Sequence, residues 1–508
     1  MRIPIIDPFL NKITMYRLTL YYLIGLASAA FILSFLKLLP FSPLDVLTDT
    51  VVVTLSCYIF NFFFSKFFRA PTNIESVFIT ALILFFLIPV KLPLNISFFV
   101  AASFFAMASK YLVTVNKIHI FNPAAAGVAA VSLLSPERSA IWWVGTTWMF
   151  PFVLVGGLLL LRKIQREDMI FTFLLTYFGL IAIPSFFHGG IGSIISSYQT
   201  ALLRSPLFFF SSVMLTEPLT SPTGEQNRRT YASITALLYS TPQLRLLGFA
   251  FTPELALCIG NIFSYIVNPK YKFFLRLKEK IKISPDIYLF NFGKIPNFNF
   301  IPGQYMEWTI PHKNTDSRGN RRYFSIASSP EEELKIAVKF YDDSSSYKKA
   351  LLESDSQKQI IASSLSGDFV LPKKETRIVF IAGGVGIAPF RSIIQNLVEK
   401  KQRADIVLLF VNKKKEDIVF EDLFEEAVSY GIRTVYSLTD TESVPSDWKG
   451  DVGRVTPLMI ASKIPDYESR KFYISGPQPM VKSYQEVLSS MGIKKGNIIV
   501  DYFPGYED

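Results

Sequence analysis

Two patterns of hydrophobic and polar residues divide the chain near residue 270. Before that point long apolar stretches follow one another with short polar breaks, and a helix needs about 17–25 apolar residues to cross a bilayer. Ten stretches approach this length. We therefore predict ten transmembrane helices, over residues 17–38, 46–65, 73–90, 94–114, 119–134, 140–161, 169–187, 194–215, 230–248 and 252–268.

The eighth of these stretches is interrupted by Arg204, Ser205 and Pro206. A broken helix inside a membrane is tolerated where protein, rather than lipid, surrounds the freed backbone groups. This interruption therefore indicates a site lined by protein.

In the remainder of the chain the apolar stretches are short and alternate with polar residues, as in a soluble fold. Alternating strands are predicted at 287–290, 304–310 and 334–340, separated by turn residues, as in a small antiparallel barrel. From about residue 376 strands and helices alternate, at 377–382, 392–400, 406–411, 422–430, 434–438 and 471–475, which is typical of a parallel sheet with crossover helices. We expect three domains: a transmembrane domain over 1–269, a β-barrel over 270–373 and an α/β domain over 374–508.

The segment 270–282 is basic and leaves two interpretations open. It is either an amphipathic linker near lipid headgroups or the solvated first strand of the barrel.

The distribution of charged residues supports the division of the chain near residue 270 and predicts how the first part is oriented in the membrane. The first 269 residues hold 17 Lys and Arg and 10 Asp and Glu, and the rest holds 35 and 31. With the N-terminus in the cytoplasm, the predicted inner loops carry 12 basic residues and the outer loops 4, which satisfies the positive-inside rule. We expect a multi-pass protein of the inner (cytoplasmic) membrane, with both termini and the C-terminal half in the cytoplasm. The net charge of +11 is then explained by topology, and no nucleic-acid partner is expected.

Two motifs in the C-terminal half carry redox chemistry. Arg322-Tyr323-Phe324-Ser325 offers a cation for a pyrophosphate, a flat ring for an isoalloxazine and a hydroxyl for the flavin N5. About 55 residues later, an apolar strand leads into Gly383-Gly384-Val385-Gly386, whose backbone can approach a second pyrophosphate closely. Together the motifs predict FAD and NADH or NADPH in one polypeptide.

These motifs, with Pro302-Gly303-Gln304-Tyr305 and Ser475-Gly476-Pro477-Gln478-Pro479-Met480, resemble the ferredoxin–NADP reductase superfamily over about 270–508. The resemblance implies hydride transfer from a nicotinamide to FAD, with Phe324, Ser325 and Ser475 as catalytic residues. It further implies that Arg322 pairs with the FAD pyrophosphate and that Phe503 shields the flavin. The other cofactor-binding residues that it implies are Ile326, Ala327, Ser328, Ser346, Tyr347, Gly383, Gly384, Gly386, Ile387, Ala388, Pro389, Gly476, Pro477 and Met480.

Two segments of the membrane half combine polar and small residues. Asn122-Pro123-Ala124-Ala125 opens one predicted helix, and Thr216-Glu217-Pro218 places a carboxylate beside a proline at a membrane edge. A helix-ending turn explains each equally well from the residues alone.

Over about 10–269 these segments and the hydropathy resemble the family of membrane flavin subunits found in the sodium-translocating NADH:quinone oxidoreductase and in the Rnf complex, with Glu217 where that family usually has Asp. The resemblance implies a flavin held in the bilayer by Asn122, Pro123, Thr216 and Glu217. The family's Ser-Gly-Ala-Thr-like attachment motif is missing, so the expected flavin is non-covalent FMN or riboflavin.

The counts of a few residue types exclude other redox centres. Two stacked haems in the bilayer need four histidine ligands, whereas the chain has three His, one of them, His312, in the barrel. Its two cysteines are too few for an iron–sulfur cluster, and no metal is expected.

The leading hypothesis is an FAD-dependent NAD(P)H oxidoreductase that passes electrons to a membrane flavin, a quinone or an extracytoplasmic acceptor. The alternative is a redox-driven sodium or proton translocating subunit, for which intramembrane carboxylates are expected. Glu75, Glu217 and Glu254 all lie near the ends of predicted helices, so electron transfer without pumping is favoured. Ten helices also exceed what a simple membrane tether requires.

Overall fold

The computed structural model describes residues 10, 13–70, 72–90, 96–135, 139–241, 245–246, 249–296, 298–316, 319–372 and 377–501. The chain forms two compact units, Ile13–Tyr271 and, together with Met1–Lys12, Lys272–Asp508. Each is described by itself below.

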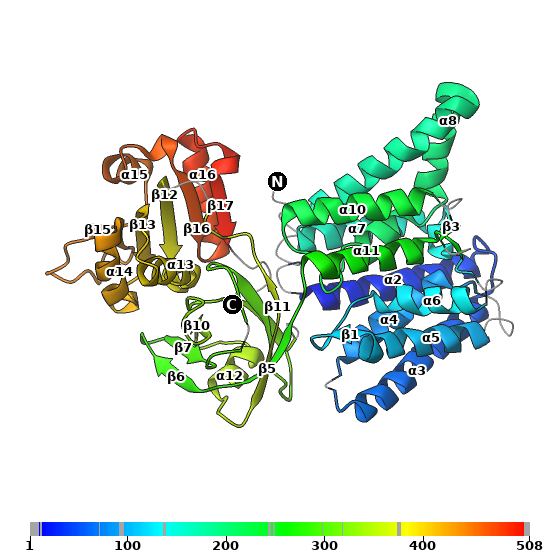
Figure 1. The fold of residues 1–508 in the computed structure, drawn as a ribbon, viewed down its shortest axis with the longest axis horizontal. Coiled ribbons are helices and arrows are strands. Elements are labelled where there is room, and N and C mark those ends of the chain that lie inside the picture. Colours follow the sequence, from blue (N-terminus) through cyan, green and yellow to red (C-terminus); the bar gives the residue numbers. More distant parts are fainter. Residues whose placement is uncertain are drawn as a thin grey trace. The chain divides into compact units, whose positions relative to one another are not determined.

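The first unit is helical (Figure 1). Its helices are α2 (Met15–Phe35), α3 (Pro43–Phe67), α4 (Ile74–Leu87), α5 (Ile96–Leu112), α6 (Pro123–Leu134), α7 (Phe150–Ile164), α8 (Glu167–Leu203), α9 (Leu207–Phe209), α10 (Glu225–Ser240) and α11 (Pro253–Val267). A π-helical turn, η2 (Phe210–Met214), follows α9. The described residues of the unit also form two short hairpins: β1 (Thr114–Val115) with β2 (Ile118–His119), and β3 (Arg245–Leu246) with β4 (Phe249–Ala250).

The prediction of ten transmembrane helices is corrected by these bounds. Within the described residues, three helices are long and apolar enough to cross a membrane: α2, α3 and α8. Four more are apolar but shorter, namely α4, α5, α6 and α11. A helix rises about 1.5 Å per residue, so the 12 residues of α6 cover only part of a hydrocarbon core about 30 Å thick. Hydropathy counts apolar residues across a turn as readily as within a helix.

Several predicted boundaries also shift. The break predicted between the seventh and eighth helices is present, because α8 consists of two helices that meet at a kink with non-helical backbone at Gly189 and Gly190. The chain breaks again after Leu203, as the Arg204–Pro206 interruption predicted. The ninth ends at Ser240, and part of its predicted C-terminal end forms β3. The sixth begins only at Phe150, after a 3-10 turn at Trp143–Gly145.

The second unit begins with antiparallel strands. One sheet has the order β5 (Lys272–Arg276), β11 (Gln359–Ser366), β8 (Tyr305–Thr309), β9 (Arg321–Ser325), and the other the order β10 (Lys335–Lys339), β7 (Ile287–Asn291), β6 (Glu279–Lys282). A bridge between Ile326 and Ile336 joins them, and the inward-facing residues form one core around Trp308 and Tyr347. One short helix, α12 (Ser346–Leu352), packs into this core. The segment 270–282 supplies β5 and β6, so its strand interpretation is confirmed.

The rest of this unit is a parallel sheet in the order β15 (Asp451–Val452), β14 (Ile432–Leu438), β13 (Asp405–Asn412), β12 (Arg377–Gly383), β16 (Lys471–Ser475), β17 (Ile498–Asp501). Along β12, Ile378 and Phe380 face a core shared with α13 (Ala388–Glu399) and α14 (Glu421–Ala427). Val379 and Ile381 face a second core with α15 (Pro457–Lys463) and α16 (Gln478–Ser490). Both faces are covered, which is why these strands read as continuous apolar runs. Figure 1 shows the sheet between its helices.

Candidate active site

The order of the parallel sheet determines where a ligand can bind. Strands β13, β14 and β15 extend from one side of β12, and β16 and β17 from the other, so the order reverses between β12 and β16. Ligands of such sheets bind beyond the carboxyl ends of the strands at this reversal. The predicted glycine loop follows β12, and Ser475-Gly476-Pro477 follows β16, so the two nucleotide motifs meet at the reversal point.

A cleft of about 430 Å³ opens there and is shared with the barrel. The predicted residues that line it are Arg322, Phe324, Ser325, Gly386, Ala388, Pro389, Ser475, Gly476 and Pro477. A second cavity of about 570 Å³ is lined by Gly383, Gly384, Pro477 and Met480, together with Asn412, Lys413 and Arg454. The structure therefore brings together motifs that lie more than 150 residues apart in the chain.

The barrel side of the cleft presents a cation and rings. Arg322 is 4% exposed, and its Nη1 donates to the backbone carbonyls of Arg321 at 2.7 Å and Gly319 at 3.2 Å. Its guanidinium carbon lies 5.0 Å from the ring centroid of Tyr347, whose own ring centroid is 6.1 Å from that of Phe324. Lys348 adds a second cation to the lining. This donor set fits an aromatic cofactor with a pyrophosphate.

Ser325 is paired with an acid from the far end of the chain. Its Oγ donates to Oδ2 of Asp501, the last residue of β17, at 3.0 Å, and both residues line the cleft. Burial raises the pKa of Asp501 to about 6, although the hydrogen bond from Ser325 lowers it.

At Gly386 the glycine loop is packed against backbone so closely that only glycine fits. A Cβ on Gly386 would lie 2.4 Å from the Ser475 carbonyl oxygen, and one on Gly383 would lie 2.1 Å from the Met480 sulfur. Backbone can therefore approach backbone where the two loops meet, which leaves room for a pyrophosphate and a nicotinamide in front of them. With the cations and rings opposite, the residues present fit FAD and a nicotinamide nucleotide.

Other predicted residues lie behind the cleft or outside the described residues. Ile326 and Ile387 are fully buried, and Ala327 and Ser328 offer their carbonyls to α13. Ser346 and Tyr347 lie in α12, where Ser346 Oγ accepts from the Asp316 amide at 3.0 Å and Tyr347 is in the barrel core. Phe503 lies outside the described residues.

Sequence reasoning missed several lining residues, among them Lys348, Tyr341, Asp501 and Arg454. Lys348 directly follows the predicted Ser346-Tyr347 pair. Asp501 is the last residue of a strand, and the glycine loop likewise follows the end of a strand. This position at the carboxyl end of a strand was the signal in the sequence that could have identified Asp501 as a lining residue.

In the helical unit the two predicted motif segments also meet. Asn122 Nδ2 donates to Glu217 Oε2 at 2.8 Å, and Thr220 Oγ1 donates to the same oxygen at 2.9 Å. Asn122, Pro123 and Glu217 line a cavity of about 50 Å³ together with residues of α2, α4, α7 and η2. Thr216 is fully buried and donates to the Ser212 carbonyl at 2.8 Å.

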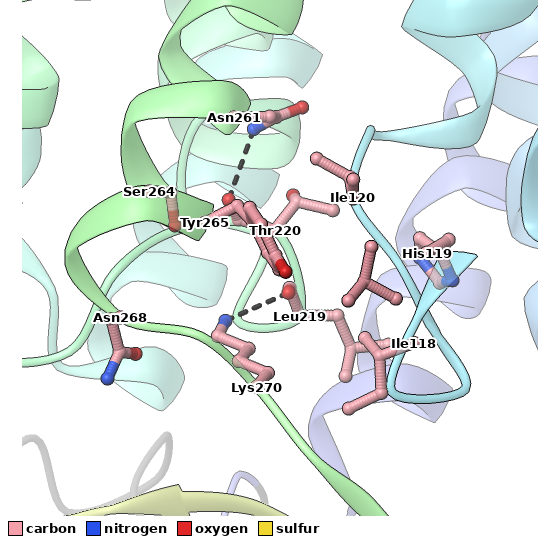
Figure 2. Close-up of a pocket in the computed structure, with 11 residues that line it drawn as sticks. Ile118, His119, Ile120, Leu219, Thr220, Asn261, Ser264, Tyr265, Asn268 and Lys270 are labelled. Carbon is pink, nitrogen blue, oxygen red and sulfur yellow. Dashed lines mark hydrogen bonds between the residues drawn. The ribbon is translucent and has the colours of Figure 1, made fainter. Parts of the chain in front are cut away.

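The turn after Glu217 is held from two sides, as Figure 2 shows. Asn261 of α11 donates to the Thr220 carbonyl at 3.2 Å, and its Oδ1 accepts from the Asn122 amide at 2.9 Å. Lys270 Nζ donates to the carbonyls of Leu219 at 2.8 Å and Ser221 at 2.7 Å, and also to that of Pro218. The segment that carries Glu217 is therefore a fixed loop.

In the part of the chain that the structure describes, no group of three or more His, Cys, Asp or Glu side chains could hold a metal ion.

Comparison with known proteins assigns the class of the C-terminal half. Residues 380–486 match the oxidoreductase NAD-binding domain family. NADH-cytochrome b5 reductase 1 of Ajellomyces capsulatus is 27% identical over 257 residues, covering 47% of this chain and 82% of that protein. One subunit of the Na(+)-translocating NADH-quinone reductase of Actinobacillus pleuropneumoniae is 26% identical over 144 residues, covering 27% and 35%. The cytochrome b5 reductase domain of Ulva prolifera nitrate reductase is similar in structure, with 22% identity, coverage of 45% and 97%, and a TM-score of 0.41.

The C-terminal half is similar to ferredoxin–NADP reductase-type modules, and the protein is an FAD-dependent NAD(P)H oxidoreductase. When bound, FAD would be held by Arg322, Phe324 and Ser325 and would supply a two-electron acceptor for the hydride that leaves C4 of the nicotinamide.

Proposed function

We propose that this chain is a membrane-bound electron conduit. NAD(P)H reduces FAD in a cytoplasmic reductase module, and the electrons then pass to a flavin or quinone site in the helical unit and on to a quinone or an extracytoplasmic acceptor. In this proposal the helical unit is anchored in the inner membrane by several spans, with both termini in the cytoplasm, and resembles the membrane flavin subunits named above.

The surface of the helical unit supports a membrane location. Along α8, Phe171, Leu175, Ile183 and Phe187 are between 59% and 82% exposed, and α3 carries a similar row of exposed apolar side chains. Soluble proteins rarely expose contiguous apolar surface on this scale. Lipid is the environment in which such faces are stable.

The observation that carries the proposal is the contact between Asn122 and Glu217. The two residues lie 95 positions apart, each in a segment singled out for flavin binding, and they meet at the wall of one cavity. The element that directly precedes the Glu217 segment, η2, is a π-helix, a form that occurs frequently at functional sites. The lining combines polar groups, among them the Asn122 amide, the Glu217 carboxylate and Ser76, with apolar side chains such as Ile79, Ile83 and Leu160, a mixture that suits a flavin or quinone ring.

The comparisons favour a quinone among the candidate acceptors. The similar subunit from Actinobacillus pleuropneumoniae belongs, by its name, to an enzyme that joins NADH oxidation to quinone reduction. In this chain the reductase module would oxidise the nicotinamide nucleotide, and the apolar helical unit would bind the quinone.

The proposal is tested by substituting Glu217→Ala in the full chain, with Glu225→Ala as the control. Glu225 is 58% exposed and paired with Arg229 one helical turn away, so its loss is expected to be neutral. We expect Glu217→Ala to preserve NAD(P)H:ferricyanide activity and to lower quinone reduction at least about tenfold, the effect of losing about 1.4 kcal/mol of interaction. Activity is normalised to folded, FAD-containing protein. Wild-type quinone reduction per folded molecule would leave Glu217 a purely structural residue.

Redox-driven ion translocation is the second candidate, favoured by one observation. Asp49 of α3 and Glu254 of α11 are both fully buried in the helical unit, and Trp142 Nε1 donates to Glu254 Oε2 at 3.1 Å. The sequence placed Glu254 at a helix end and did not single out Asp49. Buried carboxylates among apolar helices are typical of ion pathways. Proteoliposomes that acidify or accumulate sodium during NAD(P)H oxidation would support this function, and oxidation with no ion movement would exclude it.

A further inference from the structure

A buried ion pair joins the barrel to the nucleotide-binding domain within the second unit. Arg391, on the first turns of α13, is 8% exposed. Its Nη2 donates to Glu332 Oε1 at 2.9 Å, its Nη1 contacts Glu332 Oε2, and Nη1 also donates to the Ala327 carbonyl at 2.8 Å. One planar side chain thus grips a carboxylate and a backbone carbonyl of the barrel, a geometry available to Arg and not to Lys. We call Arg391, Glu332 and the Ala327 carbonyl the interdomain clamp.

Neighbouring residues reinforce the interdomain clamp. Ser392 Oγ donates to the Ser328 carbonyl at 2.6 Å, and Ser329 Oγ donates to Glu399 Oε2 at 2.5 Å. Glu332 also accepts from the Ser329 amide at 2.9 Å. Helix α13 therefore holds the segment 327–332 along most of its length.

Each end of the interdomain clamp is two residues away in sequence from a residue that lines the cleft. Ala327 is two residues after Ser325, which lines the cleft from the flavin side. Arg391 is two residues after Pro389, which lines it from the nucleotide side. Since β9 and α13 are rigid elements, the separation between the flavin strand and the nucleotide loop is set where the clamp joins them.

The clamp remains charged over the working pH range. Burial acts to raise the pKa of Glu332, but the hydrogen bonds and charge of Arg391, with Lys335 and the Ser329 amide, lower it to about 2. The guanidinium also lies 5.4 Å from the centroid of the Phe420 ring, which fixes its plane from another side.

We propose that the Arg391–Glu332 pair is a positioning device for the reductase reaction, setting the distance across which hydride passes between the nicotinamide and the flavin. This role concerns the reductase module alone and does not depend on the acceptor proposed for the helical unit. A misplacement of about 1 Å between reacting groups can cost about a hundredfold in rate, so a small relaxation at the clamp has a large kinetic effect.

The experiment compares Arg391→Ala, Arg391→Lys and the double variant Arg391→Leu/Glu332→Leu with wild type in the full chain. The double variant removes both charges, so that neither partner of the ion pair is left without the other. Arg403→Ala, at an exposed arginine of the same domain, is the control. FAD reduction by NADH and by NADPH is followed by stopped flow at saturating nucleotide, alongside FAD content, melting temperature and the dissociation constant for NAD+ or NADP+.

We expect the limiting rate of FAD reduction in the Leu/Leu variant to fall about 10- to 100-fold, with FAD content and NAD+ or NADP+ affinity within about twofold of wild type. The long-wavelength absorbance of stacked nicotinamide and flavin should weaken in parallel. Arg391→Lys keeps the positive charge but loses the paired N–H donors of the guanidinium, so its rate of FAD reduction should lie between those of the double variant and wild type. Arg403→Ala should reduce FAD at the wild-type rate. A variant that melts earlier yet reduces its bound FAD at the wild-type rate would show that the clamp only stabilises the fold and would overturn the proposal, as would wild-type values throughout.

Discussion

The two units place their predicted motifs in contrasting surroundings. In the reductase unit the motif loops surround open clefts of about 430 and 570 Å³, and their polar groups face these spaces. In the helical unit Asn122 and Glu217 border a cavity of about 50 Å³ and hydrogen-bond to each other.

The contrast indicates how each site binds its ligand. The reductase clefts are preformed, so binding requires little rearrangement and the motif residues contribute directly. In the helical unit a ring the size of a flavin or a quinone can enter only if side chains move, and it must replace the contact between Asn122 and Glu217. We therefore expect weaker and more exchangeable binding there, consistent with a non-covalent ligand.

The largest effect is expected at the glycine loop. In Gly386→Ala the new Cβ would overlap backbone atoms of Ser475 and Gly476, and overpacking of this kind costs about 1–3 kcal/mol or more. We expect NAD(P)H oxidation to fall about 100-fold while FAD is retained. Gly496→Ala, in the same domain with open space around its Cβ position, should be neutral. A Gly386→Ala enzyme with normal nucleotide oxidation would contradict the close approach of the two loops.

The next effect concerns FAD itself. Arg322→Ala removes a cation that lines the cleft, and charge-assisted hydrogen bonds contribute about 1.5–3 kcal/mol. FAD affinity should fall about 10- to 100-fold, measured by the flavin-to-protein ratio after dialysis. Arg321→Ala changes the neighbouring side chain, which is not part of the lining, and should retain FAD. Equal flavin content in the two variants would rule out the assigned role of Arg322.

A smaller effect is expected from the acid at the end of β17. Because burial raises the folded-state pKa of Asp501 to about 6, above an unfolded value of about 4, the stability associated with its protonated form is lost as pH rises from about 4 through 6. Asp501→Asn should therefore melt a few degrees higher than wild type at pH 8, with the difference vanishing near pH 4. The exposed Glu486→Gln should show no such trend. A difference that is independent of pH would contradict the raised pKa.

Local sequence predicted the reductase site better than it predicted the helical fold. Arg322, Phe324 and Ser325 could be predicted to line one site because they lie close together on one strand, and the glycine loop because it directly follows an apolar strand. The roles assigned to these residues stay predictions. Asp501 and the Arg391–Glu332 contact depend on how distant elements pack, which spacing does not encode.

In the helical half, hydropathy predicted where helices lie but not how long each one is. Hydropathy located most of the helices but overestimated the number long enough to span, because residues such as Asn122-Pro123, which begin a helix, were counted within it. From the sequence, the segments that contain Asn122 and Glu217 could be recognised only as two motifs of one family. That the two side chains contact each other could be seen only in the folded structure.

The most direct test of the conduit compares the full chain in liposomes with the module comprising residues 272–508. We expect both to contain FAD and to reduce ferricyanide with NADH or NADPH at similar rates per flavin. Only the full chain should reduce a lipid-soluble quinone efficiently, about tenfold or more faster than the module per flavin. Equal quinone reduction by the isolated module would contradict the account, because the helical unit would then contribute nothing to electron delivery.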